Sequence, residues 1–280
     1  MDSKTLKSAE VLFDLAYAED VGDGDITTNN LVPPEQNKTA ILIAKKEGVI
    51  AGLPVAEMVF KKFDKDLEWN VKLPDGSKVF PGDVLVEFKG SYRALLSGER
   101  KALNFLQRLS GIATYANRCM KEIEGHNVEI LDTRKTLPGY RYLDKYAVRM
   151  GGASNHRFGL YDMVMIKNNH IQVAGGIKKA VEEIRKNVPR SMKIEVETTN
   201  LDQVQEALDS NVDIIMLDNM SSQLMREAVL LIDKRAKIEA SGNMTIKRIR
   251  KVAATGVNYI SIGALTHSVK ALDISQRIID

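Results

Sequence analysis

Cysteine, tryptophan and long apolar runs are scarce in this sequence. Its 280 residues include a single cysteine, Cys119, and a single tryptophan. One cysteine cannot form an internal disulfide, which fits a reducing compartment, and we expect Cys119 to be a buried structural thiol. No segment approaches the ~20 apolar residues of a membrane span, and the N-terminal stretch lacks a secretory signal peptide. These absences predict a cytoplasmic protein that does not bind a membrane.

An excess of charge of one sign is also missing. Forty basic residues stand against 37 acidic residues, which gives a net charge of +3. This balance argues against nucleic-acid binding by bulk electrostatics, so a preference for anions must come from local placement of Lys and Arg. Hydrophobic residues make up 44% of the chain, enough for a sizeable core in one large domain or two ordinary ones.

The first part of the chain mixes helices with short strands. The pattern predicts an amphipathic helix over 4–19, a strand–turn–strand over 39–52 and a helix over 55–63. The expected apolar face of the first helix consists of Leu6, Val11, Leu12, Leu15 and Ala16. Short strands around two turns follow, and then a long helix over 92–122. We expect the domain boundary inside or near this helix.

The second part has a repeating rhythm. Short apolar runs recur at 128–133, 163–167, 193–197, 213–218, 237–241 and 258–263, and helical patterns separate most of them. Strands that alternate with helices predict βα units and a parallel sheet, here a (β/α) barrel with fewer than eight units. A doubly wound open sheet is the competing architecture, and the lack of a GxGxxG motif weakens its dinucleotide-binding version.

Polar residues or glycines stand at the end of each predicted strand. They are Thr133-Arg134-Lys135, Lys167, Glu197, Asp218, Ser241-Gly242-Asn243 and Gly263-Ala264. In a (β/α) barrel these ends meet at one mouth, where active sites lie. Each residue taken singly has an ordinary structural explanation: Glu197 and Asp218 can cap helices, and His156 can be a satisfied core histidine. Six equivalent positions together favour an active site.

The charges at these positions indicate the ligands. Basic side chains suit carboxylates and phosphates, and the basic set comprises Arg134, Lys135, Arg157, Lys167 and, from outside the barrel, Arg100. The acidic pair Glu197 and Asp218 suits a divalent metal, sugar hydroxyls or a developing positive charge. The late glycine-bearing turns suit a phosphate. The combination predicts an anionic acceptor, a phosphorylated sugar and a cationic transition state.

The same motifs resemble those of a known family. LDTRKTLPGYRYLDKYAVRMGGASNHRFGLYDMVMIKNNH, over 131–170, resembles the signature region of the quinolinate phosphoribosyltransferases. The resemblance extends in order through EDVGDGDITT, ERKALNFLQRLSGIAT, IEVET, IIMLDN, IEASGN and SIGALTHS, and so covers nearly the whole chain. It implies transfer of a phosphoribosyl group from phosphoribosyl pyrophosphate to quinolinate with loss of CO₂, which gives nicotinate mononucleotide for NAD biosynthesis.

The resemblance also implies a fold and an assembly. The family fold is α/β: an N-terminal α/β sandwich domain, here 1–110, followed by an open, incomplete (β/α) TIM-like barrel, here 111–270. A tail over 271–280 can return to the N-terminal domain. In this family the arginine that matches Arg100 reaches the neighbouring subunit's site. A homodimer is therefore the minimum unit, and a hexamer stays open.

Residue roles follow from the same resemblance. The quinolinate carboxylates would be held by Arg100, Arg134, His156, Arg157 and Lys167. Lys135 and Lys167 would face the phosphates of phosphoribosyl pyrophosphate, whereas Glu197 and Asp218 would bind ribose hydroxyls and Mg²⁺; these four are the expected catalytic residues. The 5′-phosphate would be cradled by Ser241, Gly242, Asn243, Gly263, Ala264 and His267. The substrate-binding set is completed by Thr133 and Ile262.

Four positions depart from the family's commonest pattern, and other functions stay open. Leu137 stands where threonine is usual, Ala153 and Asn243 where glycine is usual, and Asn168 where an acidic residue is frequent. None of these removes an expected catalytic group. The alternatives are a paralogue of the same fold, of the molybdenum-transport-associated type, a Schiff-base lyase that uses a barrel lysine, and a non-catalytic ligand sensor.

Overall fold

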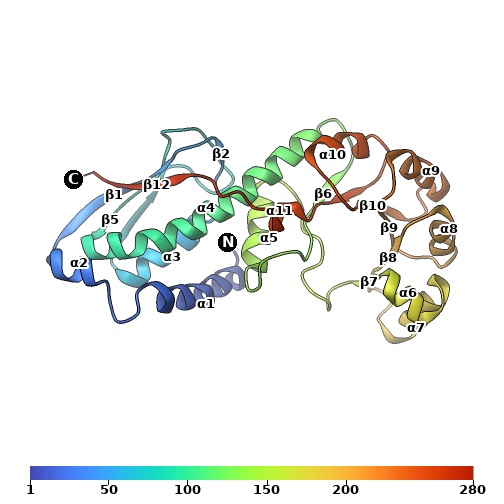
Figure 1. The fold of residues 1–280 in the computed structure, drawn as a ribbon, viewed down its shortest axis with the longest axis horizontal. Helices are drawn as coiled ribbons and strands as arrows, with labels where there is room; N and C mark the ends of the chain where they lie inside the picture. The colour runs from blue at the N-terminus through green and yellow to red at the C-terminus, as the bar shows by residue number, and fades with distance from the viewer. Residues whose placement is uncertain (280) are drawn as a thin grey trace. The chain divides into compact units, whose positions relative to one another are not determined.

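The computed structural model describes residues 1–279, and the chain divides into two compact units (Figure 1). The first unit contains Met1–Asn117, Thr136–Gly152 and the residues from Thr266 onward. The second unit contains Arg118–Lys135 and Ala153–Leu265. The chain therefore crosses between the units several times.

The first unit combines two antiparallel sheets with helices. Its elements are α1 (Ser3–Asp20), α2 (Ile26–Leu31), β1 (Asn37–Ala44), β2 (Gly48–Val49), α3 (Leu53–Phe63), β3 (Glu68–Val71), β4 (Lys78–Val79), β5 (Val84–Ser91), most of α4 (Tyr92–Glu122), α5 (Arg141–Met150), part of α11 (Ala264–His267) and β12 (Ile274–Ile278). The larger sheet has the order β12-β1-β5-β3, and β2 pairs with β4 in a small second sheet. The last strand of the chain thus lies at the edge of the first sheet.

Aromatic packing forms much of this unit's core. The rings of Phe60 on α3 and Phe88 on β5 lie 4.8 Å apart, and Trp69 on β3 lies 5.0 Å from Phe88. Ring centroids at such distances stabilise a core beyond the area that they bury. The predicted helix over 55–63 and the strand pattern around the turns are confirmed.

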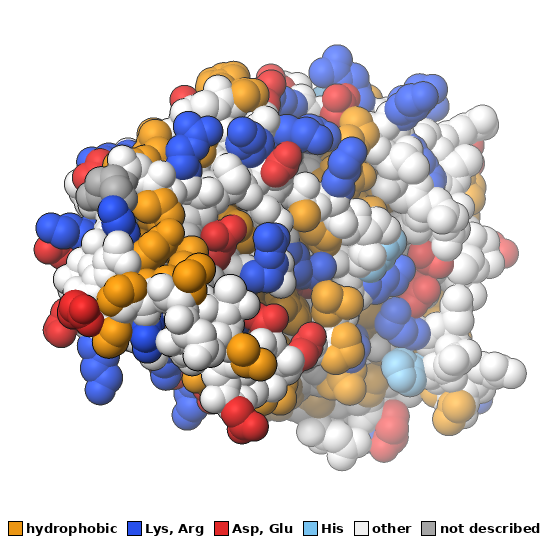
Figure 2. Space-filling view, turned by 60° about the vertical axis from the view of Figure 1, so that its left-hand side comes forward, with side chains coloured by type: hydrophobic (Ala, Val, Ile, Leu, Met, Phe, Trp, Pro, Cys, Tyr) orange, Lys and Arg blue, Asp and Glu red, His pale blue; other side chains and the backbone are white. Residues whose placement is uncertain are grey.

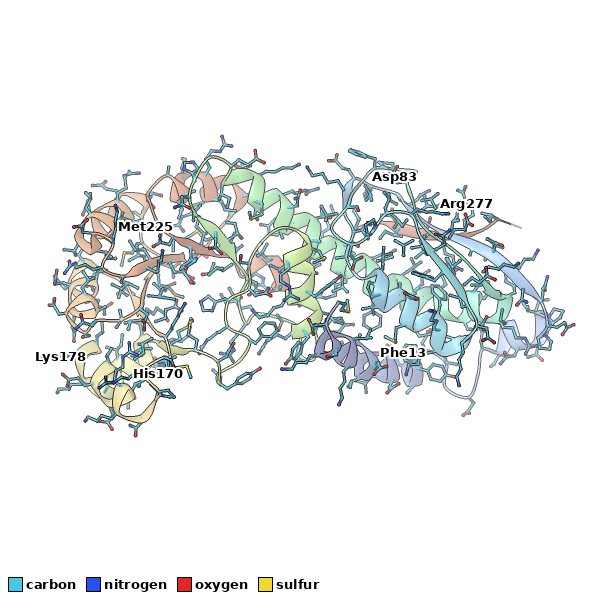
Figure 3. The ribbon with its side chains drawn as sticks, turned by 180° about the vertical axis from the view of Figure 1, so that it is seen from behind. Phe13, Asp83, His170, Lys178, Met225 and Arg277 are labelled. Carbon is cyan, nitrogen blue, oxygen red and sulfur yellow. The ribbon has the colours of Figure 1, made fainter. Side chains whose placement is uncertain are left out.

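The face predicted for the first helix is wrong, although the helix itself is confirmed. The buried residues of α1 are Thr5, Ala9 and Phe13, and Leu15 is 64% exposed. These buried positions are four residues apart, so they form one row along the helix. Phe13 (Figure 3) packs edge-on against Phe63 of α3, with ring centroids 6.1 Å apart, and this aromatic contact decides which row faces inward.

The helix α5, which the sequence analysis did not predict, belongs to the first unit. Its Asp144 is fully buried and accepts hydrogen bonds from Arg108 of α4, with 2.9 Å between Nη2 and Oδ2. Tyr146 donates to Asp75 at 2.6 Å. These buried polar contacts hold residues 136–152 in this unit, although they lie between two segments of the other.

The second unit is an open parallel sheet with helices. Its elements are β6 (Glu129–Leu131), β7 (Val164–Ile166), α6 (Asn168–Ala174), α7 (Ile177–Asn187), β8 (Ile194–Thr198), α8 (Leu201–Asp209), β9 (Ile214–Asp218), α9 (Ser222–Ile232), β10 (Lys237–Ser241), α10 (Ile246–Ala253) and β11 (Tyr259–Ser261). All six predicted strands are present, in the order β6-β11-β10-β9-β8-β7. Within the described residues β6 and β7 do not pair, so the barrel is open and incomplete, as predicted. The order never reverses inside the sheet, which excludes a doubly wound architecture.

The helices, the single thiol and the surface charges agree with the composition of the chain. Among residues 1–279 no helix is both long and apolar enough to cross a membrane. Cys119 is buried, as predicted, and burial raises the pKa of its thiol to about 12. Figure 2 shows basic and acidic side chains interspersed over the visible face, in keeping with the even charge count.

Candidate active site

Three polar side chains end adjacent strands of the parallel sheet on one face. Glu197 lies near the end of β8, and Asp218 and Ser241 end β9 and β10. Asp218 pairs in register with Ser241, and Glu197 pairs with Met216, two residues before Asp218. Because side chains alternate along a strand, all three lie on the same face of the sheet. All three are half-buried, so each can still reach a ligand.

A lysine accompanies the acidic pair. Lys167 directly follows β7, and its Nζ lies 3.5 Å from Oε2 of Glu197. Its side chain is 50% exposed, which leaves the ammonium accessible to an anion. The Lys167 backbone N–H donates to Nδ1 of His170 at 3.0 Å and so fixes the start of α6.

Two arginines form the second cationic group. Burial lowers the pKa of Arg157, and the neighbouring charge of Arg134 lowers it further, so the two guanidiniums act on one another. The Arg157 guanidinium donates to the Met163 carbonyl at 2.9 Å, which holds it in place. Like charges brought together inside a fold are typical of a site that binds an anion.

Both ring nitrogens of His156 have protein partners. Nε2 lies 3.1 Å from Oε2 of Glu195 and 3.2 Å from Oε2 of Glu239. Nδ1 accepts the Arg157 backbone N–H at 2.8 Å. The contacts of His156 are thus those expected of a core histidine whose ring nitrogens both have partners. Arg157 follows it directly in the chain.

The protonation of this cluster follows from its geometry. Burial alone lowers the pKa of His156, but the hydrogen bonds and charges of Glu195 and Glu239 raise it to about 10. A proton on Nδ1 would oppose the Arg157 N–H, so the contact geometry places a single ring proton on Nε2. Burial, and then the charge of Glu239, raises the pKa of Glu195 to about 7.

The loops after β9 and β10 are bound to one another. Gly242 has φ +89°, and a Cβ there would meet Asn219 Oδ1 and lie 2.9 Å from the Asn219 backbone nitrogen. Asn243, at φ 48°, donates from Nδ2 to Asn219 Oδ1 at 3.1 Å. Arg248 donates to the carbonyls of Gly242 and Met220. Only glycine fits at Gly242, and the result is a rigid turn at the sheet edge where Asp218 and Ser241 end.

The other predicted residues lie at the same strand ends or in the first unit. Ile262 is buried, and its N–H donates to the Leu131 carbonyl at 2.9 Å. Lys135 is exposed and donates its backbone N–H to Thr133 at 3.1 Å. Gly263 and Ala264 follow β11 and are half-buried. Two predicted residues belong to the first unit, and these are Arg100, exposed on α4, and His267, at the end of α11.

Comparison with known protein families decides the identity of this arrangement. The family model "Quinolinate phosphoribosyl transferase, N-terminal domain" matches residues 25–110, and the corresponding C-terminal domain model matches residues 112–277. The chain belongs to the quinolinate phosphoribosyltransferase family. The resemblance stated from the motifs is thereby confirmed.

Relatives and solved structures extend the match over almost the full length. A probable nicotinate-nucleotide pyrophosphorylase (carboxylating) of Synechocystis is 46% identical over 94% of this chain and 90% of its own. A tobacco quinolinate phosphoribosyltransferase (decarboxylating) is 44% identical over 94% of this chain and 80% of its own. The nicotinate-nucleotide pyrophosphorylase structure from Francisella tularensis superposes with a TM-score of 0.94 at 40% identity, over 98% and 97% of the two chains. These similarities do not favour the paralogue or the lyase.

Three buried carboxylates of this quinolinate phosphoribosyltransferase-family site were missed by the sequence analysis. They are Asp132, Glu195 and Glu239, each fully buried. Asp132 accepts the His156 backbone N–H at 2.9 Å and the Asn155 amide at 2.7 Å. The available signal was an acidic residue inside an otherwise apolar strand, as Glu195 in IEVET and Glu239 in KIEAS.

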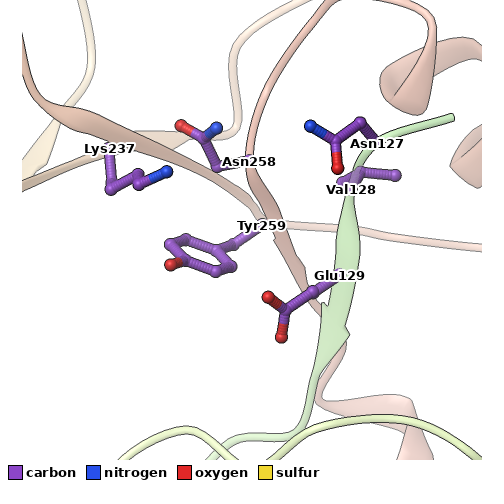
Figure 4. A pocket seen from close by; sticks show the side chains of 6 residues that line it. All are labelled: Asn127, Val128, Glu129, Lys237, Asn258 and Tyr259. Carbon is purple, nitrogen blue, oxygen red and sulfur yellow. The ribbon is translucent and has the colours of Figure 1, made fainter. Parts of the chain in front are cut away.

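A small pocket lies at the opposite end of the strands. It is lined by Asn127, Val128, Glu129, Lys237, Asn258 and Tyr259, all at the amino ends of β6, β10 and β11 (Figure 4). In a family whose fold is a (β/α) barrel, residues at this end serve stability, and chemistry occurs at the carboxyl ends. The predicted site residues Lys167, Glu197 and Asp218 lie at the carboxyl ends instead.

Proposed function

We propose that this protein transfers a phosphoribosyl group from phosphoribosyl pyrophosphate to quinolinate and releases CO₂. The observation that carries the proposal is the division of the polar residues of the second unit into a basic and an acidic set. Arg134, Arg157 and Lys167 supply positive charge, whereas Glu197 and Asp218 supply two carboxylates on the same sheet. A dicarboxylate acceptor and a sugar that develops positive charge need these two kinds of group.

The basic residues would bind and orient quinolinate. Arg134 and Arg157 offer planar donors that match carboxylates, and Lys167 offers a compact charge. With both carboxylates held, the ring nitrogen faces C1 of the ribose. Binding two reactants in this geometry removes up to about 7–11 kcal/mol from the barrier for well-oriented partners.

The carboxylates would serve the sugar. As pyrophosphate leaves, the pyridine nitrogen attacks C1, and the positive charge on the ribose is favoured by Glu197 and Asp218. The substituted nitrogen is then cationic. The bond between C2 and its carboxylate breaks, the electron pair stays on C2, and a proton from the surroundings completes nicotinate mononucleotide.

The site fits a magnesium ion and a phosphate. Glu197 and Asp218 present half-exposed oxygen donors on neighbouring strands, and oxygen is the donor that Mg²⁺ prefers. When bound, the ion would neutralise charge on the pyrophosphate. The rigid turn of Ser241, Gly242 and Asn243, with Ile262, Gly263 and Ala264, would hold the 5′-phosphate through backbone N–H groups. Thr133 and Lys135 would complete the phosphate contacts.

The working unit would be at least a homodimer in the cytoplasm. Arg100 is exposed on α4 of the first unit, and we assign it to the quinolinate site of a partner subunit. A side chain that completes a partner's site makes the active unit larger than one chain. The single, buried Cys119 fits a reducing compartment.

One assay tests the proposal. Purified protein is incubated with quinolinate, phosphoribosyl pyrophosphate and Mg²⁺, and CO₂ and nicotinate mononucleotide are measured. We expect both products in equal amounts, and none when nicotinate replaces quinolinate. Release of CO₂ without the nucleotide, or no product at all, would contradict the assignment.

Replacement of Lys167 tests the role of the cationic strand end. We expect Lys167→Ala to lower turnover by about 100-fold or more, because a charge that contacts both reactants is lost. The matched control is Lys178→Ala, an exposed lysine on α7 that lies in the same unit (Figure 3). Equal turnover in the two variants would remove Lys167 from the site.

A further inference from the structure

Two buried glutamates have no role in the chemistry described above. Glu195 on β8 and Glu239 on β10 are 0% exposed. They precede Glu197 and Ser241 by two positions, so they lie on the same face of the sheet, one layer nearer the amino ends. A carboxylate at such a depth is costly unless it is paired. The burial of these two carboxylates therefore needs a reason beyond packing.

The partner of both glutamates is the His156 ring. Nε2 of His156 lies 3.1 Å from Glu195 and 3.2 Å from Glu239, and the side chain is only 7% exposed. None of the four carboxylate oxygens meets hydrogen-bond geometry with a donor among the described residues, so the contact with His156 is one of ion-pair distance. The charge of Arg157 also acts on Glu195, and that of Glu239 on Tyr259. Nε2 of His156 thus lies close to two carboxylates on two different strands.

A chain of contacts leads from this ring to Arg157. Nδ1 of His156 accepts the Arg157 backbone N–H at 2.8 Å, which is possible only when Nδ1 carries no proton. The two carboxylates select that tautomer, because they require the proton on Nε2. The Arg157 side chain then donates to the Met163 carbonyl at 2.9 Å. Backbone and side chain of Arg157 are therefore both fixed.

The segment around His156 is anchored from the other side as well. Ser154 N–H donates to the Ile130 carbonyl of β6 at 2.9 Å, and His156 N–H donates to Asp132 at 2.9 Å. The segment 154–157 consequently follows the free edge of β6, where a closed barrel would have a further strand. The glutamates contact the same segment through the His156 ring, so strands other than β6 also hold it.

We propose that Glu195 and Glu239 are positioning residues for Arg157, acting through the His156 ring. The proposal rests on the proposed function, because it takes Arg157 to be a ligand of a quinolinate carboxylate. The glutamates would touch neither substrate. Their contribution is to keep the guanidinium at one place while the pocket is empty, so that binding does not have to order it.

A metal ion is the alternative occupant of this cluster. One donor atom from each of His156, Glu195 and Glu239 lies within 4.8 Å of the others. A histidine that binds metal through Nε2 donates its Nδ1–H to an acceptor. Here Nδ1 accepts a hydrogen bond instead, so the structure favours a proton over a metal.

The experiment compares two double variants. Glu195→Gln with Glu239→Gln keeps the shape and one acceptor oxygen at each position. Glu195→Leu with Glu239→Leu keeps a similar volume and removes the acceptors, and such replacement of buried charged groups is often tolerated by the fold. We expect the Leu pair to raise KM for quinolinate about tenfold or more, equivalent to about 1.4 kcal/mol. In the Leu pair, KM for phosphoribosyl pyrophosphate and kcat should stay within about threefold of the wild-type values. In the Gln pair, KM for quinolinate should also lie within about threefold of the wild-type value.

A second measurement reads the ring directly. The protein has four histidines, so ¹⁵N labelling of histidine gives few signals. We expect the Nε2–H tautomer of His156 in the wild type and in the Gln pair, and its loss in the Leu pair. The single Leu variants serve in the same two measurements if the double variant does not fold.

Each contrary outcome is distinct. An unchanged KM for quinolinate in the Leu pair overturns the proposal, and so does an equal rise in KM for both substrates, which marks a general structural role. A Gln pair that behaves like the Leu pair overturns the acceptor argument. Stoichiometric metal that is lost in the Gln pair identifies a metal site instead. If the wild type does not turn over quinolinate, the proposed function fails, whereas the ¹⁵N signals still test the positioning of His156.

Discussion

At the scale of single residues, backbone conformation sets what the strand-end loops can do. Gly242 and Asn243 both have positive φ, and the Asn219 side chain closes the space in which a Cβ of residue 242 would lie. The turn is therefore constrained in the absence of a ligand. If the turn binds a phosphate as proposed, this preorganisation strengthens binding, because the loop need not become ordered when the anion binds.

Gly242→Ala tests this turn. The left-handed conformation costs an L-residue about 1–2 kcal/mol of stability, and here the Asn219 contact also displaces the loop. We expect KM for phosphoribosyl pyrophosphate to rise about tenfold, which corresponds to about 1.4 kcal/mol. Gly125→Ala is the control, because Gly125 has φ +83° with nothing within 4 Å of its Cβ position. If steady-state kinetics give the same KM for both variants, the Asn219 contact does not shape the substrate site.

At the scale of the element, burial predicts the strands of the second unit, whereas the bounds of its helices depend on local breaks. Gly175 has φ +79° and Gly176 has φ +137°. These two residues end α6 and precede α7, so the segment between β7 and β8 forms two helices. The short helix α2 escaped prediction because its six residues carry little periodicity, and its N-cap Asp25 is the main local signal.

Asp25 gives α2 a pH-dependent anchor. Its carboxylate accepts from the hydroxyl and the N–H of Thr28 at 2.6 and 2.9 Å, and from Ser97 of α4 at 2.9 Å. The Thr28 hydroxyl and then its N–H lower the pKa of Asp25 below its ordinary 3.8. A lowered folded pKa means that the stabilisation is present above about pH 3.8 and is lost as the pH falls through the folded value.

We expect Asp25→Ala to reduce the free energy of unfolding by about 0.5–2 kcal/mol at pH 7, with solvent screening favouring the lower end. The difference from the wild type should shrink as the pH falls below about 4. Urea unfolding from pH 3 to 7 measures it. Asp23→Ala, an exposed acid in the same segment, should change the unfolding free energy by less than about 0.5 kcal/mol throughout. A constant Asp25 difference across this range would show that the carboxylate charge is not involved.

At the scale of the whole molecule, β12 adds an edge strand to the larger sheet of the first unit, whose other strands come from the first part of the chain. Five residues of β12 pair with β1 in antiparallel register, from Ala44↔Ile274 to Ala40↔Ile278. Leu272 and Ile274 are buried in this unit. The first unit therefore combines segments that lie far apart in the sequence, from α1 to β12.

Removal of residues 271–280 should destabilise the first unit. Loss of two buried aliphatic side chains costs about 3–6 kcal/mol, which corresponds to a fall in Tm of roughly 6–20 °C for a domain of this size. Removal of 279–280 alone keeps the five paired residues and should change Tm by only about 2 °C or less. Calorimetry of the two truncated chains decides the matter, and equal Tm values would mean that β12 adds little to the sheet.

The parallel strands, the strand-end residues and the family could all be predicted from the sequence. Apolar runs that alternate with helical patterns follow from burial on both faces, and this is a local property of each segment. Lys167, Glu197 and Asp218 could be chosen because strand ends in a (β/α) barrel meet at one mouth. The order of the motifs added the family, and the family models confirmed it.

The buried glutamates that contact His156 could not be predicted, because their contacts depend on how distant segments pack. Glu195 and Glu239 lie 44 positions apart and on different strands, and no pattern along the chain shows that both reach His156. The same holds for the buried face of α1, which depends on an aromatic partner in α3, and for α5, held by Asp144 and Arg108. Period and propensity are local, whereas pairing between distant segments depends on the free energy of the packed whole.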